Sequence, residues 1–313
     1  MSATPRATAT LLPDRGAAAR AEEFFRCAEF LEAEGVTHTL LLEGAASRAA
    51  IPLLVREIEG SGGALDASSP YAYPGGSSEG EPLDAGAIDF SATGLVSVFI
   101  RERLGEPPTL LGAQDRSLVL VADPELPRKS RMSDRQQIRK NEAAGYAIEQ
   151  LPGSESTPAQ RAAFGAVYAE TMDRLQASER YLFPPSYFDL LLGSSQARLF
   201  LAVAPDGEVA AAAIAAVSDG FLHYYLSGTA DAHLRRAPSK NLIAAVTDHA
   251  ESLGLPMNLG GGIKPGDGLE EFKRGFANRE LPFRTHQLIC DAQRYDELSA
   301  GREGADFFPL YRA

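Results

Sequence analysis

The second half of the chain carries the clearest pattern of hydrophobic and polar positions. An apolar-polar strand pattern at 146–151 and a helical pattern at 158–175 precede three apolar runs. These runs cover 198–204, 208–217 and 221–229. Pro-Asp-Gly and Asp-Gly turns separate them, and such turns are typical of antiparallel hairpins. We therefore predict a three-stranded antiparallel meander.

A helix and a short strand follow the meander. Apolar residues recur at helical spacing from about 240 to 253, with Ser239 as the expected cap and Gly254 at the end. The expected buried stripe consists of Leu242, Ile243, Val246, Ala250 and Leu253. The strand PMNLG, three glycines, a helix at 269–276 and the strand PFRTHQLICD complete the pattern. The order of strands and helices predicts an α+β unit with a mixed sheet flanked by helices.

The first half is also mixed, with weaker signals. A helix is expected at 17–34, after a short flexible segment at the N-terminus. Strands are expected at 37–44, 49–60, 95–104 and 117–123. A further helix at 134–144 has Ser133 as its expected cap, with Gln136 in the capping-box position.

The domain boundary is placed just before this last helix. We predict an N-terminal domain at 1–132 and a C-terminal domain at 133–292. The remaining segment, 293–313, is expected to pack back on the N-terminal domain.

Composition narrows the class of protein. With 313 residues, 44% hydrophobic and 23% charged, the chain is typical of soluble globular proteins. No apolar run reaches the roughly 20 residues that cross a bilayer, and no secretory signal is evident. Two distant cysteines and five scattered histidines indicate neither a disulfide framework nor a metal site. We therefore expect a cytoplasmic protein without a metal or a cofactor.

The charge distribution is uneven. The net charge of −12 disfavours non-specific binding to nucleic acid. The segment 128–140, however, holds six basic residues and a single acid, Asp134. A solvated helix face explains this run as well as a phosphate-binding site does.

Several short segments, in this order, resemble the Fem-type (FemABX) aminoacyltransferases. The element order is that of the GNAT acyltransferase fold, with a looser version in the first half. The segments are SPYAYPGG at 69–76, VFIRERL at 98–104, IRKNEAAGY at 138–146, YAETMDRLQASERYLF at 168–183, HYYLSG at 223–228, LGGG at 259–262 and FKRGF at 272–276. The resemblance spans nearly the whole chain, and it implies two GNAT-like domains in tandem without the long helical arm of some members.

The resemblance implies a reaction and its partners. Family members move an amino acid from aminoacyl-tRNA to an amine, usually on a peptidoglycan precursor or a peptide natural product. Here it implies aminoacyl-tRNA as co-substrate and a peptide-like or nucleotide-linked amine as acceptor. The amide would form without a metal or a covalent intermediate, and the oligomeric state stays open.

The resemblance also implies a catalytic group. Lys273 is expected to stabilise charge during the reaction, with Phe272 near the tRNA end. Tyr224 stands where GNAT enzymes often place a base or a hydrogen-bonding group. From the pattern alone, Lys273 would be an exposed lysine on a short amphipathic helix whose aromatic residues belong to the core.

Further residues are candidates for holding substrate. Tyr71 and Tyr73 could stack on a base or sugar, and Arg101 and Arg139 could contact anionic groups. A surface loop and ordinary salt bridges explain the same residues equally well. The other substrate candidates are Arg174, Tyr181, Ser227, Gly260 and Gly261.

The loop before the helix at 240–253 separates possible donors. GNAT enzymes that use acyl-CoA carry small residues there, so that backbone amides can hold a pyrophosphate. In RRAPSKNL these places are taken by Pro238, which has no N–H, and by Lys240. This favours tRNA over CoA, and the candidates for tRNA contact are Arg235, Arg236, Lys240 and Asn241. The alternatives are a CoA-dependent N-acyltransferase acting on a small amine and a non-catalytic GNAT-like binding module.

Overall fold

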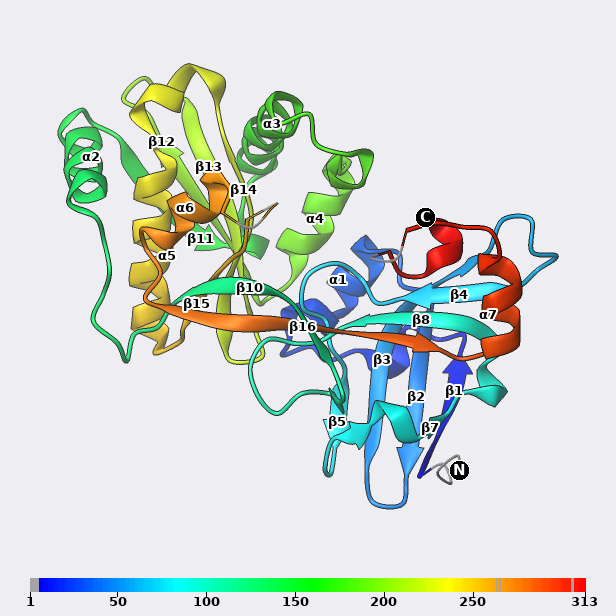
Figure 1. The fold of residues 1–313 in the computed structure, drawn as a ribbon. Coiled ribbons are helices and arrows are strands. Elements are labelled where there is room, and N and C mark those ends of the chain that lie inside the picture. The colour runs from blue at the N-terminus through cyan, green and yellow to red at the C-terminus, as the bar shows by residue number, and fades with distance from the viewer. Residues whose placement is uncertain (1–5, 263, 265, 305–306) are drawn as a thin grey trace. The chain divides into compact units, whose positions relative to one another are not determined.

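The computed structural model describes residues 6–262, 264, 266–304 and 307–313. The chain forms two compact units (Figure 1). Unit 1 consists of residues 1–21, 25–117 and 282–313, and unit 2 consists of residues 22–24 and 118–281. Apart from residues 22–24, the chain passes between the units within two long strands, β10 (Gln114–Ala122) and β16 (Arg279–Ile289). The boundary expected at 132/133 stays a prediction.

Unit 1 is built on a mixed sheet. Its strands lie in the order β16, β8, β4, β3, β2, β1, β7, while β5 pairs with β3, and β6 and β9 form a separate pair. The strands are β1 (Ala7–Leu12), β2 (His38–Gly44), β3 (Arg48–Glu57), β4 (Leu65–Ser68), β5 (Ser77–Glu79), β6 (Leu83–Asp84), β7 (Ile88–Asp89), β8 (Leu95–Arg101) and β9 (Leu110–Leu111). Two helices, α1 (Ala28–Ala33) and α7 (Ala292–Ser299), belong to this unit.

The N-terminal region differs from the prediction. The flexible segment contains β1, which pairs antiparallel with β2; residues 1–5 of that segment lie outside the described residues. The helix expected at 17–34 is reduced to α1. Phe24 and Phe25 lie before it in a 3-10 turn and are fully buried. Their spacing therefore reflects burial outside an α-helix rather than one face of an α-helix.

The C-terminal segment lies on the sheet of unit 1. The hydroxyl groups of Tyr311 and Ser97 in β8 are 2.7 Å apart. Arg312 forms an ion pair with the buried Asp66 in β4, at 3.0 Å between Nη2 and Oδ1. Residues after α7 are thus tied to two strands of this unit by both polar and apolar contacts.

Unit 2 contains the predicted meander. Its sheet has the order β11, β12, β13, β14, β15, β10. The strands are β11 (Ala147–Pro152), β12 (Ala197–Val203), β13 (Val209–Ser218), β14 (Phe221–Thr229) and β15 (Met257–Gly260). The helices are α2 (Met132–Ala143), α3 (Pro158–Arg174), α4 (Pro185–Gly193), α5 (Ser239–Leu253) and α6 (Gly268–Arg274). Strands β12, β13 and β14 pair antiparallel, which confirms the meander.

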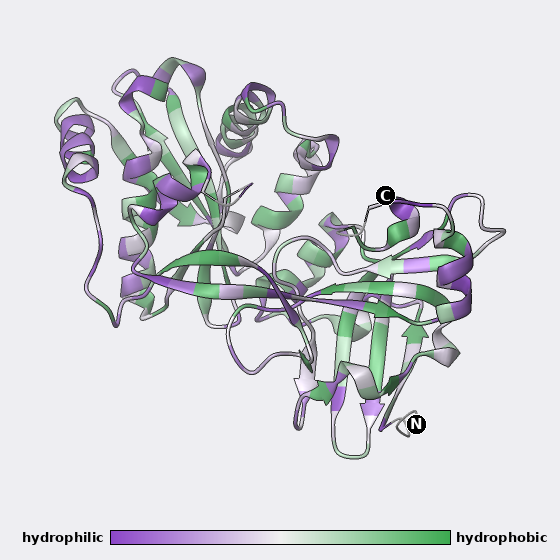
Figure 2. Ribbon diagram, viewed as in Figure 1, coloured by the Kyte–Doolittle hydropathy of each residue, from purple (hydrophilic) through white to green (hydrophobic). Residues whose placement is uncertain are grey.

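Small residues in the middle strand let helices lie close to both faces of this sheet. The side chains of residues 210–216 in β13 are fully buried, and all but Ile214 are alanine. Helix α3 packs on one face and α5 on the other (Figure 1). The sheet is coloured as apolar in Figure 2, whereas α2 is polar along most of its length.

Helix boundaries are predicted better than their caps. The stripe on α5 is buried except for Leu253, which is 46% exposed at the end of the helix. Ser239 is the first residue of α5 rather than its cap, and Ser133 lies inside α2, whose N-cap Arg131 makes no side-chain capping bond. In contrast, Thr157 forms a complete capping box with Gln160 at the start of α3.

Candidate functional site

The centre of unit 2 is a place where two parallel strands separate. β14 and β15 pair only at Leu222 with Met257 and at His223 with Asn258. Close to the same point, the register between β13 and β14 shifts, so that Tyr225 has no opposing residue. This irregularity is a β-bulge, which bends a strand and redirects its side chains. The two strands are therefore held together at one end and open toward the other.

Buried polar groups fix the last paired position. Burial lowers the pKa of His223 to about 4, so its ring is neutral at physiological pH. Its Nδ1 then accepts from Asn258 Nδ2 at 3.0 Å, and its Nε2–H donates to the carbonyl of Ser218 at 3.1 Å. Asn258 Oδ1 in turn accepts from the backbone N–H of Gly260 at 2.8 Å. Both ring nitrogens of His223 are therefore engaged in hydrogen bonds that hold this part of the sheet together.

The backbone requires glycine at the last position of β15 and at the position after it. Gly260 has a φ of +72°, a conformation that costs energy for residues with a side chain. A Cβ on Gly261 would lie 2.9 Å from the carbonyl oxygen of Leu118 in β10. Both substrate candidates thus shape the chain so that backbone groups approach one another closely.

Helix α6 places Lys273 against this glycine segment. The side chain of Asp267 caps α6 by accepting from the N–H of Glu270 at 2.8 Å. In the last turn, Lys273 Nζ donates to the carbonyl oxygen of Gly261 at 2.8 Å. Burial lowers the pKa of Lys273 to about 8, although the charge of Asp267 acts in the opposite direction. The ammonium group forms no ion pair with a carboxylate of the described residues, so its charge is only weakly compensated.

Two aromatic candidates flank the same core. Phe272 and Tyr224 both pack against the hydrophobic cluster beneath α5, and Phe272 makes an edge contact with Phe276 at 5.7 Å. Burial raises the pKa of Tyr224 to about 12, against the opposing effect of a hydrogen bond with Ser227. The phenol therefore stays protonated at neutral pH and can donate a hydrogen bond, but it cannot serve as a base.

Arg174 and Tyr181 lie near the end of β14. Arg174 Nη1 donates to the carbonyl of Thr229 at 3.2 Å and also pairs with Asp231. The carbonyl of Tyr181 accepts from the hydroxyl of Tyr168 at 3.0 Å. These contacts tie α3 and the segment after it to the meander, and a role in substrate binding stays a prediction.

The loop before α5 and the first turn of α5 are tied to α2 by side-chain contacts. Lys240 Nζ pairs with Asp134 Oδ1 of α2 at 2.8 Å. Asn141 Nδ2 lies 2.8 Å from both the side-chain oxygen of Asn241 and the carbonyl of Arg236. The side chains of Arg235 and Arg236 are exposed. The structure thus separates the four tRNA candidates into two exposed arginines and two residues bound to α2.

Three of the remaining candidates belong to unit 1, and one belongs to unit 2. In unit 1, Tyr71 is 42% exposed, whereas Tyr73 makes edge contacts with Phe25 and Phe283. Arg101 Nη1 donates to the carbonyl of Ser69 at 2.7 Å, beside this loop. In unit 2, Arg139 lies on α2 and lines a cavity that is described below.

Sequence reasoning missed Tyr225 and Asn258. The hydroxyl of Tyr225 is 3.1 Å from that of Tyr187, and its ring contacts the edge of Phe24 at 5.7 Å. A simple alternation of faces cannot reveal a bulge, so the sequence gives no signal for Tyr225. The buried polar residue inside the apolar run PMNL was the available signal for Asn258.

Comparisons with known proteins agree with this geometry. Residues 128–274 match the family described as Acetyltransferase (GNAT) domain. The structure of FemX is similar over 87% of this chain and 93% of that chain, with a TM-score of 0.61 and 11% identity. This chain has a GNAT domain within a FemX-like fold. The structure of a conserved Bacteroides thetaiotaomicron protein of unknown function is similar over 85% of this chain and 89% of that chain, with a TM-score of 0.54 and 8% identity.

A further similar structure is the C-terminal domain of a protein from Agrobacterium fabrum that is described as a lysylphosphatidylglycerol synthetase. It is similar over 78% of this chain and 81% of that chain, with a TM-score of 0.50 and 15% identity. No curated protein sequence matches the chain. The GNAT domain contains every candidate from Arg139 to Lys273, and together with the fold it supports an acyltransferase.

Two structural features are absent from the described residues. None of the described helices is long and apolar enough to span a bilayer. Likewise, the described part of the chain contains no group of three or more His, Cys, Asp or Glu side chains placed to hold a metal ion.

Proposed function

We propose that this protein transfers an amino acid from aminoacyl-tRNA to an amine on a peptide-like or nucleotide-linked acceptor, such as a cell-wall precursor or a peptide antibiotic. The observation that carries the proposal is the setting of Lys273. Its ammonium group lies on the carbonyl of Gly261, where β14 and β15 have separated, and no carboxylate of the described residues pairs with it. A charge in such a place is suited to stabilising an oxyanion.

The reaction needs alignment more than acid or base strength. The neutral acceptor amine attacks the ester carbonyl, a C–N bond forms and the carbonyl oxygen gains negative charge. The ammonium of Lys273 stabilises that charge, and Tyr224 can donate a hydrogen bond because its phenol is protonated. The C–O bond of the ester then breaks. The amine proton is transferred, directly or through water, to the departing ribose oxygen.

The loop before α5 supports RNA rather than CoA as the donor. In this loop, the N–H of Lys240 donates to the carbonyl of Ala237 at 3.1 Å, and the N–H of Asn241 donates to the carbonyl of Pro238 at 3.0 Å. Pro238 has no N–H of its own. At this helix start, position 238 thus offers no amide and the amides of Lys240 and Asn241 are engaged, while α2 is tied to the loop through Asn141.

The similar fold of the protein described as a lysylphosphatidylglycerol synthetase bears on the acceptor. The name of that protein describes the attachment of an amino acid, lysine, to the headgroup of a lipid. The fold alone therefore does not select a peptide amine, and phosphatidylglycerol belongs among the acceptors that are tested. The choice between acceptors stays part of the proposal.

The decisive experiment measures transfer of labelled amino acids from a total aminoacyl-tRNA pool, with labelled acetyl-CoA in parallel. The acceptors are peptidoglycan precursors, short peptides and phosphatidylglycerol vesicles. We expect transfer that requires charged tRNA and disappears after treatment with RNase. Transfer from acetyl-CoA that resists RNase would overturn the proposal in favour of a CoA-dependent N-acyltransferase.

A further inference from the structure

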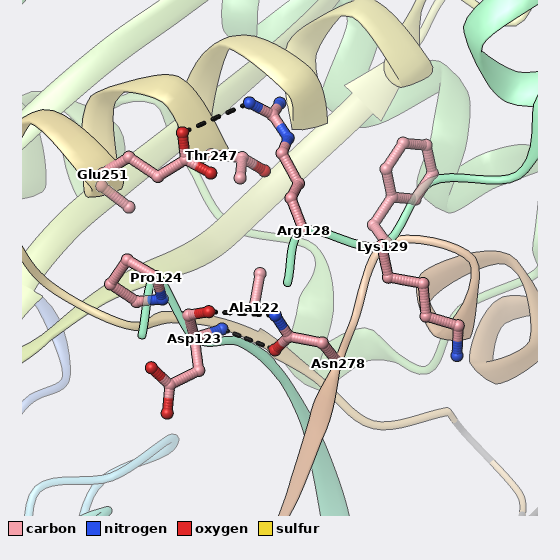
Figure 3. Close-up of a pocket in the computed structure, with 10 residues that line it drawn as sticks. Ala122, Asp123, Pro124, Arg128, Lys129, Thr247, Glu251 and Asn278 are labelled. Atoms are coloured by element: carbon pink, nitrogen blue, oxygen red, sulfur yellow. Dashed lines mark hydrogen bonds and ion pairs between the residues drawn. The ribbon is translucent and has the colours of Figure 1, made fainter. Parts of the chain in front are cut away.

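An open cavity of about 420 Å³ lies beside the candidate site, within unit 2. Its walls come from the segment before α2, from α2 itself and from α5. A volume of this size lies within the range of sites that bind small molecules or parts of larger ligands. Figure 3 shows the adjoining small pocket. There the side chain of Arg128 extends toward Glu251 of α5, and the side chain of Lys129 points away from Glu251.

The walls of the cavity are basic in a protein whose net charge is −12. Four basic side chains line it, against two acidic ones. The basic residues are Arg128, Lys129, Arg135 and Arg139, and the acidic residues are Glu142 and Asp248. Four residues of the basic run between 128 and 140 thus line one cavity, an arrangement that a solvated helix face does not require.

Only part of this positive charge is used to hold the fold. Arg128 pairs with Asp248 at 2.5 Å and with Glu251 at 3.3 Å, which fastens the segment before α2 to α5. Lys129 and Arg139, in contrast, form no ion pair with any described carboxylate. Among the described residues, Arg135 donates only to the carbonyl of Ser130. Three cations therefore line the cavity without a carboxylate partner in the described part of the chain, and an anionic ligand would supply one.

The floor of the cavity is apolar. Ile138, Ala244 and Phe276 lie among its lining residues. Phe276 follows α6 and is three positions from Lys273, so the cavity adjoins the helix that holds the proposed catalytic group. A basic rim around an apolar floor suits a nucleotide unit, whose phosphate is charged and whose base and sugar are partly apolar.

We propose that this cavity binds backbone phosphates of the donor RNA near its acceptor end, with Arg139 and Lys129 as the principal contacts. This inference rests on the proposed function, because that function makes an RNA the donor. It assigns the RNA to the surface formed by α2 and α5, in addition to the exposed arginines of the loop before α5.

Two neighbouring residues on α2 offer a matched test. Arg139 lines the cavity and Lys140 does not, although both are exposed cations of one helix. The assay measures the binding of an RNA minihelix that ends in CCA and carries no amino acid. Binding is followed by fluorescence anisotropy over a series of salt concentrations. We expect Arg139→Ala to weaken binding roughly tenfold and to lower the slope of log K against log salt by about 0.7–0.9, the contribution of one phosphate contact. Lys140→Ala should change neither quantity appreciably.

Further variants secure the interpretation. Lys129→Ala should act like Arg139→Ala, and Arg139→Lys should restore part of the affinity, because lysine also binds phosphate, as a point charge. Equal losses from Arg139→Ala and Lys140→Ala would indicate a diffuse electrostatic field and overturn the site, as would no loss from either. Competition by AMP as strong as by RNA of equal phosphate content would assign the cavity to a free nucleotide and overturn the RNA assignment.

The two proposals fail separately. The binding assay contains no amino acid, so it is independent of transfer. RNase-sensitive transfer together with RNA binding that ignores Arg139 would refute the cavity site and leave the proposed function. RNA binding that depends on Arg139, without transfer from any aminoacyl-tRNA, would refute the proposed function and leave the cavity as an RNA-binding site.

Discussion

Two lysines of unit 2 have opposite surroundings. Lys240, at the start of α5, pairs with Asp134 at 2.8 Å and joins α5 to α2. Lys273, at the end of α6, has a carbonyl oxygen as its partner at the same distance, and burial lowers its pKa to about 8. Both side chains are largely shielded from water, but only one of the two charges is matched by an opposite charge.

The difference separates a cation that stabilises the fold from one that is available for chemistry. Burying a cation without a carboxylate costs free energy, and proteins accept that cost most often at functional sites. A charge already neutralised by Asp134 has little left to offer a developing oxyanion. We therefore expect substitution of Lys240 to affect stability and substitution of Lys273 to affect turnover.

The largest effect is expected from Lys273→Ala. Turnover in the transfer assay should fall by an order of magnitude or more, up to the roughly 100- to 1,000-fold loss typical of removing an oxyanion donor. The far-ultraviolet circular dichroism spectrum should remain that of the unchanged protein. Near-normal turnover in this variant would remove Lys273 from the mechanism.

Lys240→Ala should produce the reverse pattern. It leaves the carboxylate of Asp134 unpaired while only 7% of that side chain is exposed, so the free energy of unfolding should fall by about 3 kcal/mol. Urea denaturation measures this loss. The matched variant is Lys240→Met combined with Asp134→Asn, which removes both charges and should recover most of the stability. If it recovers none, the ion pair is not what stabilises this junction.

The dependence of turnover on pH should separate the two lysines further, through a fall of about tenfold for each pH unit well above the pKa of Lys273. Because the pKa of Lys273 is about 8, its ammonium form is dominant at pH 7 and falls about tenfold for each pH unit well above 8. The rate at saturating substrate should therefore decline above pH 8, even though the acceptor amine becomes more nucleophilic. In Lys273→Arg, whose side chain stays charged, any remaining activity should lack this decline. An identical decline in both proteins would assign it to another group.

Local signals were sufficient for much of this fold. The meander, α3 and α5 are recovered within a few residues, because turn residues and apolar periodicity act over short distances. The segment at 17–34 was predicted wrongly because the burial of Phe24 and Phe25 depends on distant chain segments. The predicted caps Ser133 and Ser239 were also wrong, because Arg131 and Pro238 occupy the N-cap positions and neither makes a side-chain capping bond.

The candidate site was less accessible from the sequence. The FKRGF segment pointed to Lys273, but its contact with Gly261 depends on the glycines after β15 and on the capping of α6. The bulge at Tyr225 cannot be predicted from the alternation of apolar and polar residues along β14. The basic run was visible, yet only the structure distinguishes Arg139, which lines the cavity, from Lys140, because the cavity wall is formed partly by residues about a hundred positions away on α5.

The smallest effect is expected from Lys273→Met. In the folded state the pKa of Lys273 is lowered from 10.5 to about 8, so the folded protein binds fewer protons than the unfolded chain between these values. Stability of the unchanged protein should therefore rise with pH across this window, and the cost of the buried charge is fully present below pH 8. Methionine removes that cost but also the hydrogen bond to Gly261, and the two changes should nearly cancel, to within about 1 kcal/mol at pH 7. Urea denaturation at pH 7 and pH 10 measures both proteins, and the variant should lose stability relative to the unchanged protein as pH rises. A large loss of stability that is equal at both pH values would mean that the fold needs Lys273 as it needs Lys240, and the contrast between the two lysines would then be wrong.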